Sequence, residues 1–228
     1  NLPVTYTPSG TPSEDGWCLI GNPYASSINW DDPDWTKTNM ANATYIQNPD
    51  NQIYATYIAG AGANGGSRFI ASQQSFWVQA TGASPVLTIR EGVKTPVDAV
   101  FFKSGETYSP GMTIQLNKDD LTDEAVLRHI AGALDEVEPQ FDAVKLWGGW
   151  GSHPQVTLLN NEAKDLTVHS IDKEMEEWAI PVRVVVFESG VYELKFLNTE
   201  ELDVPCLKLE DTYTGTMYDI ATDEETSL

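Results

Sequence analysis

The residues best suited to chemistry in this sequence are tryptophans that lie outside any strand-like pattern. Trp147 and Trp150 belong to the segment WGGWGSHP, in which glycines stand between and after the two rings. The apolar faces of sugar rings stack on exposed indole rings, and loops between strands are where a fold exposes such side chains. Trp147 and Trp150 therefore predict a carbohydrate-binding platform.

Trp30 and Trp35 form a second candidate pair in the polar segment 25–42, which shows no helical period. Two interpretations stay open for these rings. They stack on a glycan, as proposed for the first pair, or they fold back as lids over the core, which is the default role of large aromatic side chains.

Three carboxylates lie between these two tryptophans, at Asp31, Asp32 and Asp34. Clustered carboxylate oxygens are ligands for calcium, so the segment predicts a calcium site. The spacing is not that of an EF-hand, which needs alternating ligands, a central glycine and a distal glutamate. A solvated acidic loop is the alternative.

The sequence carries no motif that predicts catalysis. His129, His153 and His169 are not spaced as metal ligands, and no G-x-S-x-G segment is present. The glycine-rich segment 59–67 lacks the lysine that a phosphate-binding loop requires. A glycosidase needs only two facing carboxylates, so this activity stays open as an alternative to a non-catalytic role.

Charge narrows the range of partners. The net charge is -21, from 34 acidic and 13 basic residues among 228. Nucleic acids and anionic membranes bind basic surfaces, so both are excluded as predicted partners. No apolar run reaches the roughly 18 residues that a membrane-spanning helix needs. The predicted partner is a polysaccharide or a neighbouring protein chain.

The elements that must position these residues are short strands. Apolar runs of four to eight residues alternate with turns rich in glycine, proline and asparagine, and the hydrophobic fraction of 41% suffices for a core. We predict an all-β fold of two tandem antiparallel β-sandwich modules, jelly-roll or immunoglobulin-like, covering 1–95 and 96–228. Strands are expected in the first module at 4–7, 17–20, 43–47, 52–58, 69–71, 75–80 and 86–90. In the second they are expected at 97–102, 112–116, 141–146, 155–159, 165–171, 180–187, 190–197, 207–212 and 216–220.

The segment 121–137 is ambiguous. Leu127, Ile130, Leu134 and Val137 recur at helical spacing, and Thr122 or Asp123 offers a helix cap. A strand over 124–130 followed by a loop is the other interpretation.

Several segments also resemble a known family. They are GWCLIGNPY at 16–24, GGSRFIA at 65–71, FWVQA at 76–80, FDAVKL at 141–146 and LEDTYTGT at 209–216. This pattern resembles modules found near the C-terminus of large Bacteroidetes proteins that the type IX secretion system exports. The resemblance implies a strand rather than a helix at 124–130, and an extracellular or cell-surface location. It also implies further strands after Leu228, so the second module is expected to lack its last strands. Either the chain is truncated before these strands, or a neighbouring chain donates a strand in their place.

Together these observations predict a non-catalytic extracellular module for adhesion or carbohydrate binding within a larger secreted protein. A structural spacer or filament subunit is the alternative. The sequence leaves open whether Cys18 and Cys206 form a disulfide, since two cysteines are too few for a disulfide scaffold.

Overall fold

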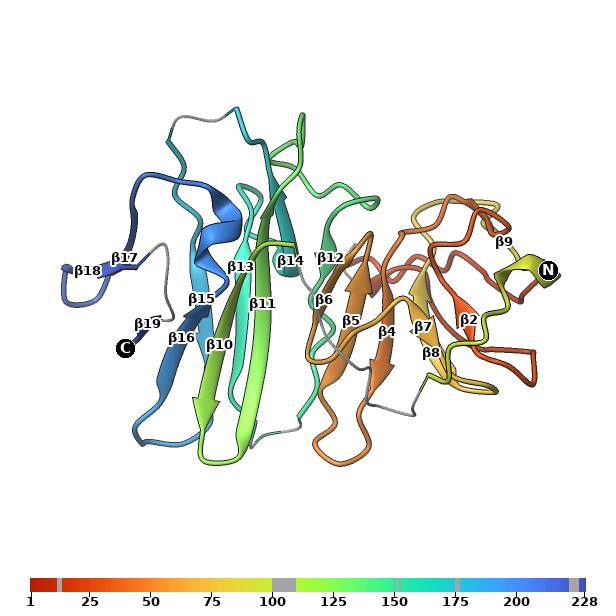
Figure 1. Ribbon diagram of the computed structural model, residues 1–228, viewed down its shortest axis with the longest axis horizontal. Coiled ribbons are helices and arrows are strands. Elements are labelled where there is room, and N and C mark those ends of the chain that lie inside the picture. The colour runs from red at the N-terminus through yellow and green to blue at the C-terminus, as the bar shows by residue number, and fades with distance from the viewer. Residues whose placement is uncertain (12–13, 100–109, 150, 152, 175–176, 222–225) are drawn as a thin grey trace.

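The computed structural model of the chain (Figure 1) describes residues 1–11, 14–99, 110–149, 151, 153–174, 177–221 and 226–228. Within these ranges the regular elements are strands and short 3-10 helices, so the prediction of an all-β fold is confirmed. None of the described helices has the length and apolar character that crossing a membrane requires.

The first sheet has five strands in the order β1-β8-β4-β5-β6, and its pairs are antiparallel. Its strands are β1 (Trp17–Gly21), β4 (Thr44–Gln47), β5 (Tyr54–Ile58), β6 (Ala61–Ala63) and β8 (Ser75–Gln79). Side chains alternate between its two faces. Phe76 and Val78 belong to one apolar cluster, whereas Trp77 packs against another. The sheet is therefore apolar on both faces.

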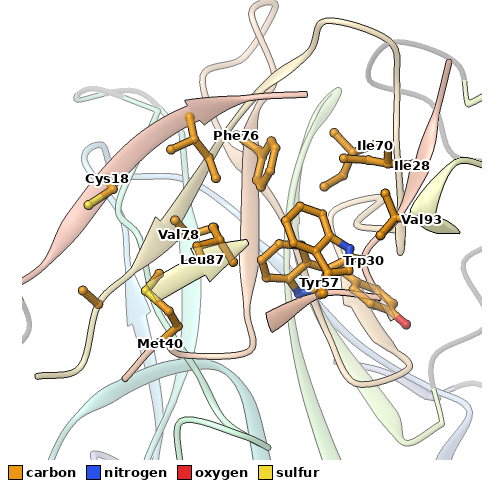
Figure 2. Packing of buried hydrophobic residues seen from close by; sticks show 13 residues of the cluster. Cys18, Ile28, Trp30, Met40, Tyr57, Ile70, Phe76, Val78, Leu87 and Val93 are labelled. Atoms are coloured by element: carbon orange, nitrogen blue, oxygen red, sulfur yellow. The ribbon is translucent and has the colours of Figure 1, made fainter. Parts of the chain in front are cut away.

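Two small antiparallel pairs cover the outer face of this sheet. They join β2 (Ile28–Asn29) to β7 (Phe69–Ile70) and β3 (Thr36–Thr38) to β9 (Val86–Thr88). Ile28, Trp30 and Val93 from this layer meet Phe76 and Tyr57 from the sheet in the first core cluster, as Figure 2 shows.

The second sheet has eight strands among the described residues, in the order β15-β13-β14-β11-β10-β16-β19, with β12 beside β14. Its strands are β10 (Met112–Lys118), β11 (Leu121–His129), β12 (Ala143–Val144), β13 (Gln155–Leu159), β14 (Asp165–Ile171), β15 (Val182–Val185), β16 (Glu193–Leu197) and β19 (Thr226–Ser227). The segment 121–137 thus contains a strand and no helix. Its apolar residues are spaced for a helix, but pairing with β10 and β14 on either side decides the backbone.

One pair in this sheet departs from the predicted antiparallel arrangement. β11 and β14 are parallel, with Val126 opposite Val168. A parallel pair needs a long crossover between its strands, and here residues 130–164 supply it. The uniformly antiparallel prediction is wrong at this pair, because local sequence does not reveal which distant strand becomes the neighbour.

The two sheets face each other across a shared core. One set of residues comes from the first sheet and from the position just before β4, and it packs with a second set from the other sheet. The first set consists of Ala43, Tyr45, Ile58, Ala61 and Ala63. That second set consists of Val126, Ala143 and Val168. β6 lies beside β11 and β14, and β5 beside β12 (Figure 1). The first and second halves of the chain are therefore joined by buried apolar surface as well as by the backbone.

A third core lies on the far face of the second sheet. Ile114, Leu127, Leu158 and Phe196 pack there under the hairpin of β17 (Leu207–Asp211) and β18 (Thr216–Ile220), beside the 3-10 helix η3 (Thr199–Leu202). A second 3-10 helix, η2 (Glu91–Val93), follows β9. Figure 1 shows the resulting stack of layers, from β2 and β9 at the N-terminal end to β17 and β18 at the other.

Several predicted strands are shorter than expected or absent. Residues 4–7 have no strand partner, although Val4 and Tyr6 pack against the first core. Residues 97–99 are not in a strand either, and the rest of the predicted strand 97–102 lies outside the described residues. Both cysteines are unbridged: Cys18 is buried in the first core, and Cys206 is exposed.

Candidate functional site

Trp30 and Trp35 belong to the core rather than to a binding platform. Their exposed fractions are 0% and 8%, and their ring centroids lie 4.7 Å apart in an edge-to-face contact. Both indole N–H groups are satisfied internally: Trp30 Nε1 donates to Asn42 O and Trp35 Nε1 to Asn29 O. The prediction that these two rings stack on a glycan is therefore wrong. Burying their apolar surface in the core that contains Phe76 and Ile28 stabilises the fold, whereas exposing it to water would cost free energy.

Two carboxylates of the acidic segment between these tryptophans accept hydrogen bonds from within the protein. Asp31 accepts a hydrogen bond from the phenol of Tyr57, and Asp32 accepts one from the backbone N–H of Asp34. Burial, together with this contact to Asp31, raises the pKa of Tyr57 above its ordinary value. Among the described residues, no group of three or more histidine, cysteine or acidic side chains is arranged around a common point. Calcium binding at Asp31, Asp32 and Asp34 stays a prediction.

Trp147 is the candidate ring that the structure leaves accessible, with 41% of its surface exposed. It follows β12 and begins the loop that leads to β13. Trp150, the other ring of the predicted platform, lies outside the described residues.

The backbone after Trp147 is held rigidly against the first sheet. The carboxamide of Gln155 brackets Gly148, accepting from its N–H at 3.2 Å and donating to its carbonyl at 2.8 Å. A Cβ at Gly148 would lie 2.2 Å from the carbonyl oxygen of Gln52, so only glycine permits this approach. The next amide, Gly149 N–H, donates to the same carbonyl at 3.3 Å. The loop therefore rests on the turn between β4 and β5.

That turn forms one wall of a polar cleft of about 210 Å³. The cleft opens where the β4–β5 turn, the loop after β6 and the start of β11 converge. Its lining residues are Asn48, Asn51, Ile53, Asn64, Gly65, Thr122 and Glu124.

The β4–β5 turn is built by its asparagines. Asn48 Oδ1 accepts from Asp50 N–H at 2.9 Å, and Asn51 Oδ1 accepts from Ile53 N–H at 3.0 Å. Each side chain thus closes a turn with its own backbone two residues on, which is the local preference that makes asparagine a turn residue. Pro49 fits the same turn because its ring fixes φ near -65° and it needs no donor.

The opposite wall is a hydrogen-bonded contact between Asn64 and β11. The backbone N–H of Asn64 donates to Glu124 Oε2 at 2.6 Å, and its side-chain Nδ2 donates to Asp123 Oδ1 at 2.8 Å. Glu124 Oε1 accepts from Gln115 Nε2 at 2.7 Å. Asp123 is fully buried and accepts two further bonds, from Lys145 Nζ at 2.5 Å and from Val156 N–H at 2.8 Å. Both carboxylates are therefore fixed in place by donors.

The Trp147 loop is fastened to this second wall as well. His153 is buried, and its Nε2 lies 2.9 Å from the carbonyl oxygen of Thr122, a cleft residue. Because a carbonyl only accepts, Nε2 of His153 carries the proton in this contact. The backbone N–H of His153 donates to Gly149 O at 3.2 Å. Trp147 thus begins a loop that is bonded to both sides of the cleft.

Comparison with protein-family models, curated proteins and solved structures gave no match to this chain.

Sequence reasoning placed Trp147 correctly in an exposed loop but did not find the cleft. Asn48 and Asn51 stood out only as turn residues, Asn64 lay in a glycine-rich loop, and Glu124 was one acid among many. No local pattern links these positions, since they meet only when the two sheets pack. His153 and His169 are not spaced as metal ligands in the sequence, and in the structure both are buried. Nδ1 of His169 lies 3.5 Å from Oδ1 of Asp142, and both side chains are buried.

Proposed function

We propose that this chain is a non-catalytic module for adhesion or carbohydrate binding, with Trp147 and the neighbouring cleft as its binding site. The observation that carries the proposal is the pairing of an exposed indole ring with a loop bonded to both walls of a polar cleft. Glycan sites combine an aromatic face for the sugar ring with fixed polar groups for its hydroxyls. Both parts are present here within one rigid junction.

The proposal places the module outside the cell, as part of a larger protein exported by the type IX secretion system. Its architecture is two tandem β-sandwich modules, 1–95 and 96–228. The separation of the five-stranded and eight-stranded sheets along the chain supports this division. The segments quoted above, from GWCLIGNPY to LEDTYTGT, support the export route.

Binding without catalysis is favoured by the lining of the cleft. Glu124 is the one carboxylate among the described lining residues, whereas glycosidases use a pair of facing carboxyl groups about 5–10 Å apart. Both oxygens of Glu124 already accept hydrogen bonds from Asn64 and Gln115. A carboxylate held in this way is suited to orienting a ligand hydroxyl.

The test is binding of the purified chain to a glycan array and to insoluble polysaccharides, with Trp147→Ala as the variant. Loss of one stacked ring is expected to weaken binding about fivefold to thirtyfold, equivalent to about 1–2 kcal/mol. Tyr213→Ala is the matched control, since Tyr213 is 96% exposed on the turn of the β17–β18 hairpin, which lies on the opposite side of the second sheet from β4 and β5 (Figure 1). A blank array, or equal binding by Trp147→Ala, would refute the proposal.

A second candidate function is assembly with a neighbouring protein chain, as a structural spacer or filament subunit. β15 is the outermost strand at one edge of the described second sheet. Val184, Val186 and Phe187, in and just after this strand, are 45%, 43% and 51% exposed. An apolar edge strand offers unpaired backbone groups to a strand from another chain. Electron microscopy of purified protein tests this candidate, and monomers at all concentrations would argue against it.

A further inference from the structure

The hydrogen-bonding groups left available in the cleft can be assigned atom by atom. Asn48 and Asn51 each use Oδ1 in their own turn, which fixes the orientation of the carboxamide. Their Nδ2 groups make no hydrogen bond to any described residue. Two N–H₂ donors are therefore left for a ligand on the turn side of the cleft.

The other wall presents acceptors. Asn64 uses Nδ2 to donate to Asp123 and to Tyr54 O, which leaves its Oδ1 as an acceptor. Thr122 Oγ1 donates its proton to Asn117 Oδ1 at 2.7 Å and so also keeps only acceptor capacity. Glu124 adds a carboxylate whose oxygens retain lone pairs beyond the bonds already made. No lysine, arginine or histidine is among the described residues that line the cleft.

We propose that the cleft binds an uncharged sugar residue through its hydroxyl groups and rejects uronic acids and sulfated sugars. The inference rests on the proposed glycan-binding function and specifies its ligand. A hydroxyl donates one hydrogen bond and accepts others, so it matches both walls at once. A carboxylate or sulfate only accepts, so the Nδ2 donors of Asn48 and Asn51 are its sole partners among the groups assigned above, while the acceptors of Asn64 and Thr122 stay unpaired and the charge of Glu124 repels it.

The size of the cleft agrees with a single sugar residue. Its volume of about 210 Å³ is below the roughly 300–1,000 Å³ of pockets that enclose drug-sized ligands. An extended chain would therefore place one residue in the cleft and its other residues outside it.

The experiment compares neutral and acidic oligosaccharides that share one ring. Glucose and glucuronic acid oligomers of equal length, and the corresponding galactose and mannose pairs, are titrated against the protein by calorimetry. An acidic ligand is repelled both by the overall charge of -21 and by Glu124 inside the cleft. Titrations at about 0.15 M and 1 M salt separate these two effects, because salt screens the overall charge much more than a contact inside the cleft. We expect binding of at least one neutral oligomer, and at least tenfold weaker binding of its acidic partner at both salt concentrations.

Asn51→Asp tests the cleft directly. The aspartate keeps the oxygen that accepts from Ile53 N–H, but it replaces the Nδ2 donor by a second acceptor. Neutral-glycan binding is expected to fall at least tenfold without a change in the thermal midpoint. Asn29→Asp is the matched control, because Asn29 Oδ1 accepts from Asp31 N–H in the same kind of turn outside the cleft, and it should leave binding unchanged. If Asn51→Asp lowers the thermal midpoint, Asn48→Asp is measured in its place.

The outcomes separate this inference from the function on which it rests. Tighter binding of an acidic oligomer overturns the inference and leaves glycan binding standing. If Asn51→Asp and Asn48→Asp bind a neutral oligomer as the wild type does, while Trp147→Ala loses this binding, the cleft is not part of the binding site. Absence of binding to every oligomer overturns both.

Discussion

Arg128 on β11 donates from Nη1 to the carbonyl oxygen of Ala59 at 2.9 Å, so a buried guanidinium of the second sheet is bonded to the end of β5 in the first. The same side chain donates to Ile58 O at 3.3 Å and to Phe141 O at 2.7 Å. Its Nε donates to Ser170 Oγ at 3.0 Å. Burial lowers the pKa of Arg128, but the surrounding oxygens satisfy its donors. The junction that forms the cleft is thus fixed by polar contacts as well as by apolar packing.

Replacing Arg128 by methionine should destabilise the protein. The variant fills much of the volume but removes the Arg128 donor from the carbonyl groups of Ile58 and Ala59, while Phe141 O keeps only the hydroxyl of Ser170. Removing one partner of a buried charged network costs about 3–5 kcal/mol. Urea denaturation measures the free energy of unfolding. Arg90→Met, at an exposed position, is the control and should change it by less than about 0.5 kcal/mol. Equal stability of the two variants would mean that Arg128 does not hold the sheets together.

Lys37 gives the stability of the protein a pH dependence. Its Nζ lies 3.7 Å from the centroid of Trp30 and donates to Trp30 O at 3.0 Å and to Asn42 Oδ1 at 2.7 Å. Burial lowers the pKa of Lys37 to about 8, partly opposed by the charge of Asp31. An unfolded lysine has a pKa of about 10.4. Between these two values the unfolded chain binds more protons than the folded one, so the free energy of unfolding rises with pH.

The free energy of unfolding is expected to increase by about 1–2 kcal/mol between pH 7.5 and 9.5 because of Lys37. Buried Tyr45 and Tyr57 have raised pKa values and act in the opposite direction, but only above about pH 10, where unfolded tyrosines ionise. Urea denaturation at the two pH values measures the slope. Lys37→Met should flatten it, whereas Lys173→Met, at an exposed position, should preserve it. A wild-type slope in Lys37→Met would assign the effect to another group.

Trp30→Ala should lower the free energy of unfolding, whereas Trp147→Ala should weaken glycan binding. Trp30 is fully buried, and its ring centroid lies 5.8 Å from that of Phe76 in an edge-to-face contact. Its truncation leaves a large cavity and removes the donor to Asn42 O, which together cost about 3–5 kcal/mol. Trp147→Ala is expected to change the free energy of unfolding by less than about 1 kcal/mol. Comparable destabilisation by both variants would contradict the accessible position assigned to Trp147.

Val184→Lys tests assembly through β15. A lysine on an exposed edge strand disfavours pairing with another strand, because its charge would have to be desolvated. If the second candidate function is correct, concentrated wild-type protein forms larger species, and Val184→Lys remains smaller under the same conditions. Size-exclusion chromatography with light scattering measures both. Val86→Lys is the control, since Val86 is 38% exposed in β9 of the first half. Identical profiles for the wild type and Val184→Lys would exclude this edge as the contact.

Most strands could be predicted from sequence because their cause is local. The alternation of Tyr192, Leu194 and Phe196 predicts a half-buried strand, and the structure places β16 there. The turn segment at 48–51 predicts a hairpin, which β4 and β5 form. The failures have a tertiary cause. Residues 4–7 have the composition of a strand but no strand partner, and Trp30 lies in a polar segment yet is buried in the first core.

The sequence by itself determined the all-β class, the positions of most strands, the net charge of -21 and the exposure of Trp147. Each of these depends on neighbouring residues or on composition. The tertiary structure decided the parallel pairing of β11 with β14, the burial of Trp30 and Trp35, and the cleft formed by Asn48, Asn51, Asn64 and Glu124. These features bring together segments that are far apart in the sequence, from Trp30 to Ile171. Which face of each segment is buried is decided only when the two sheets pack against each other.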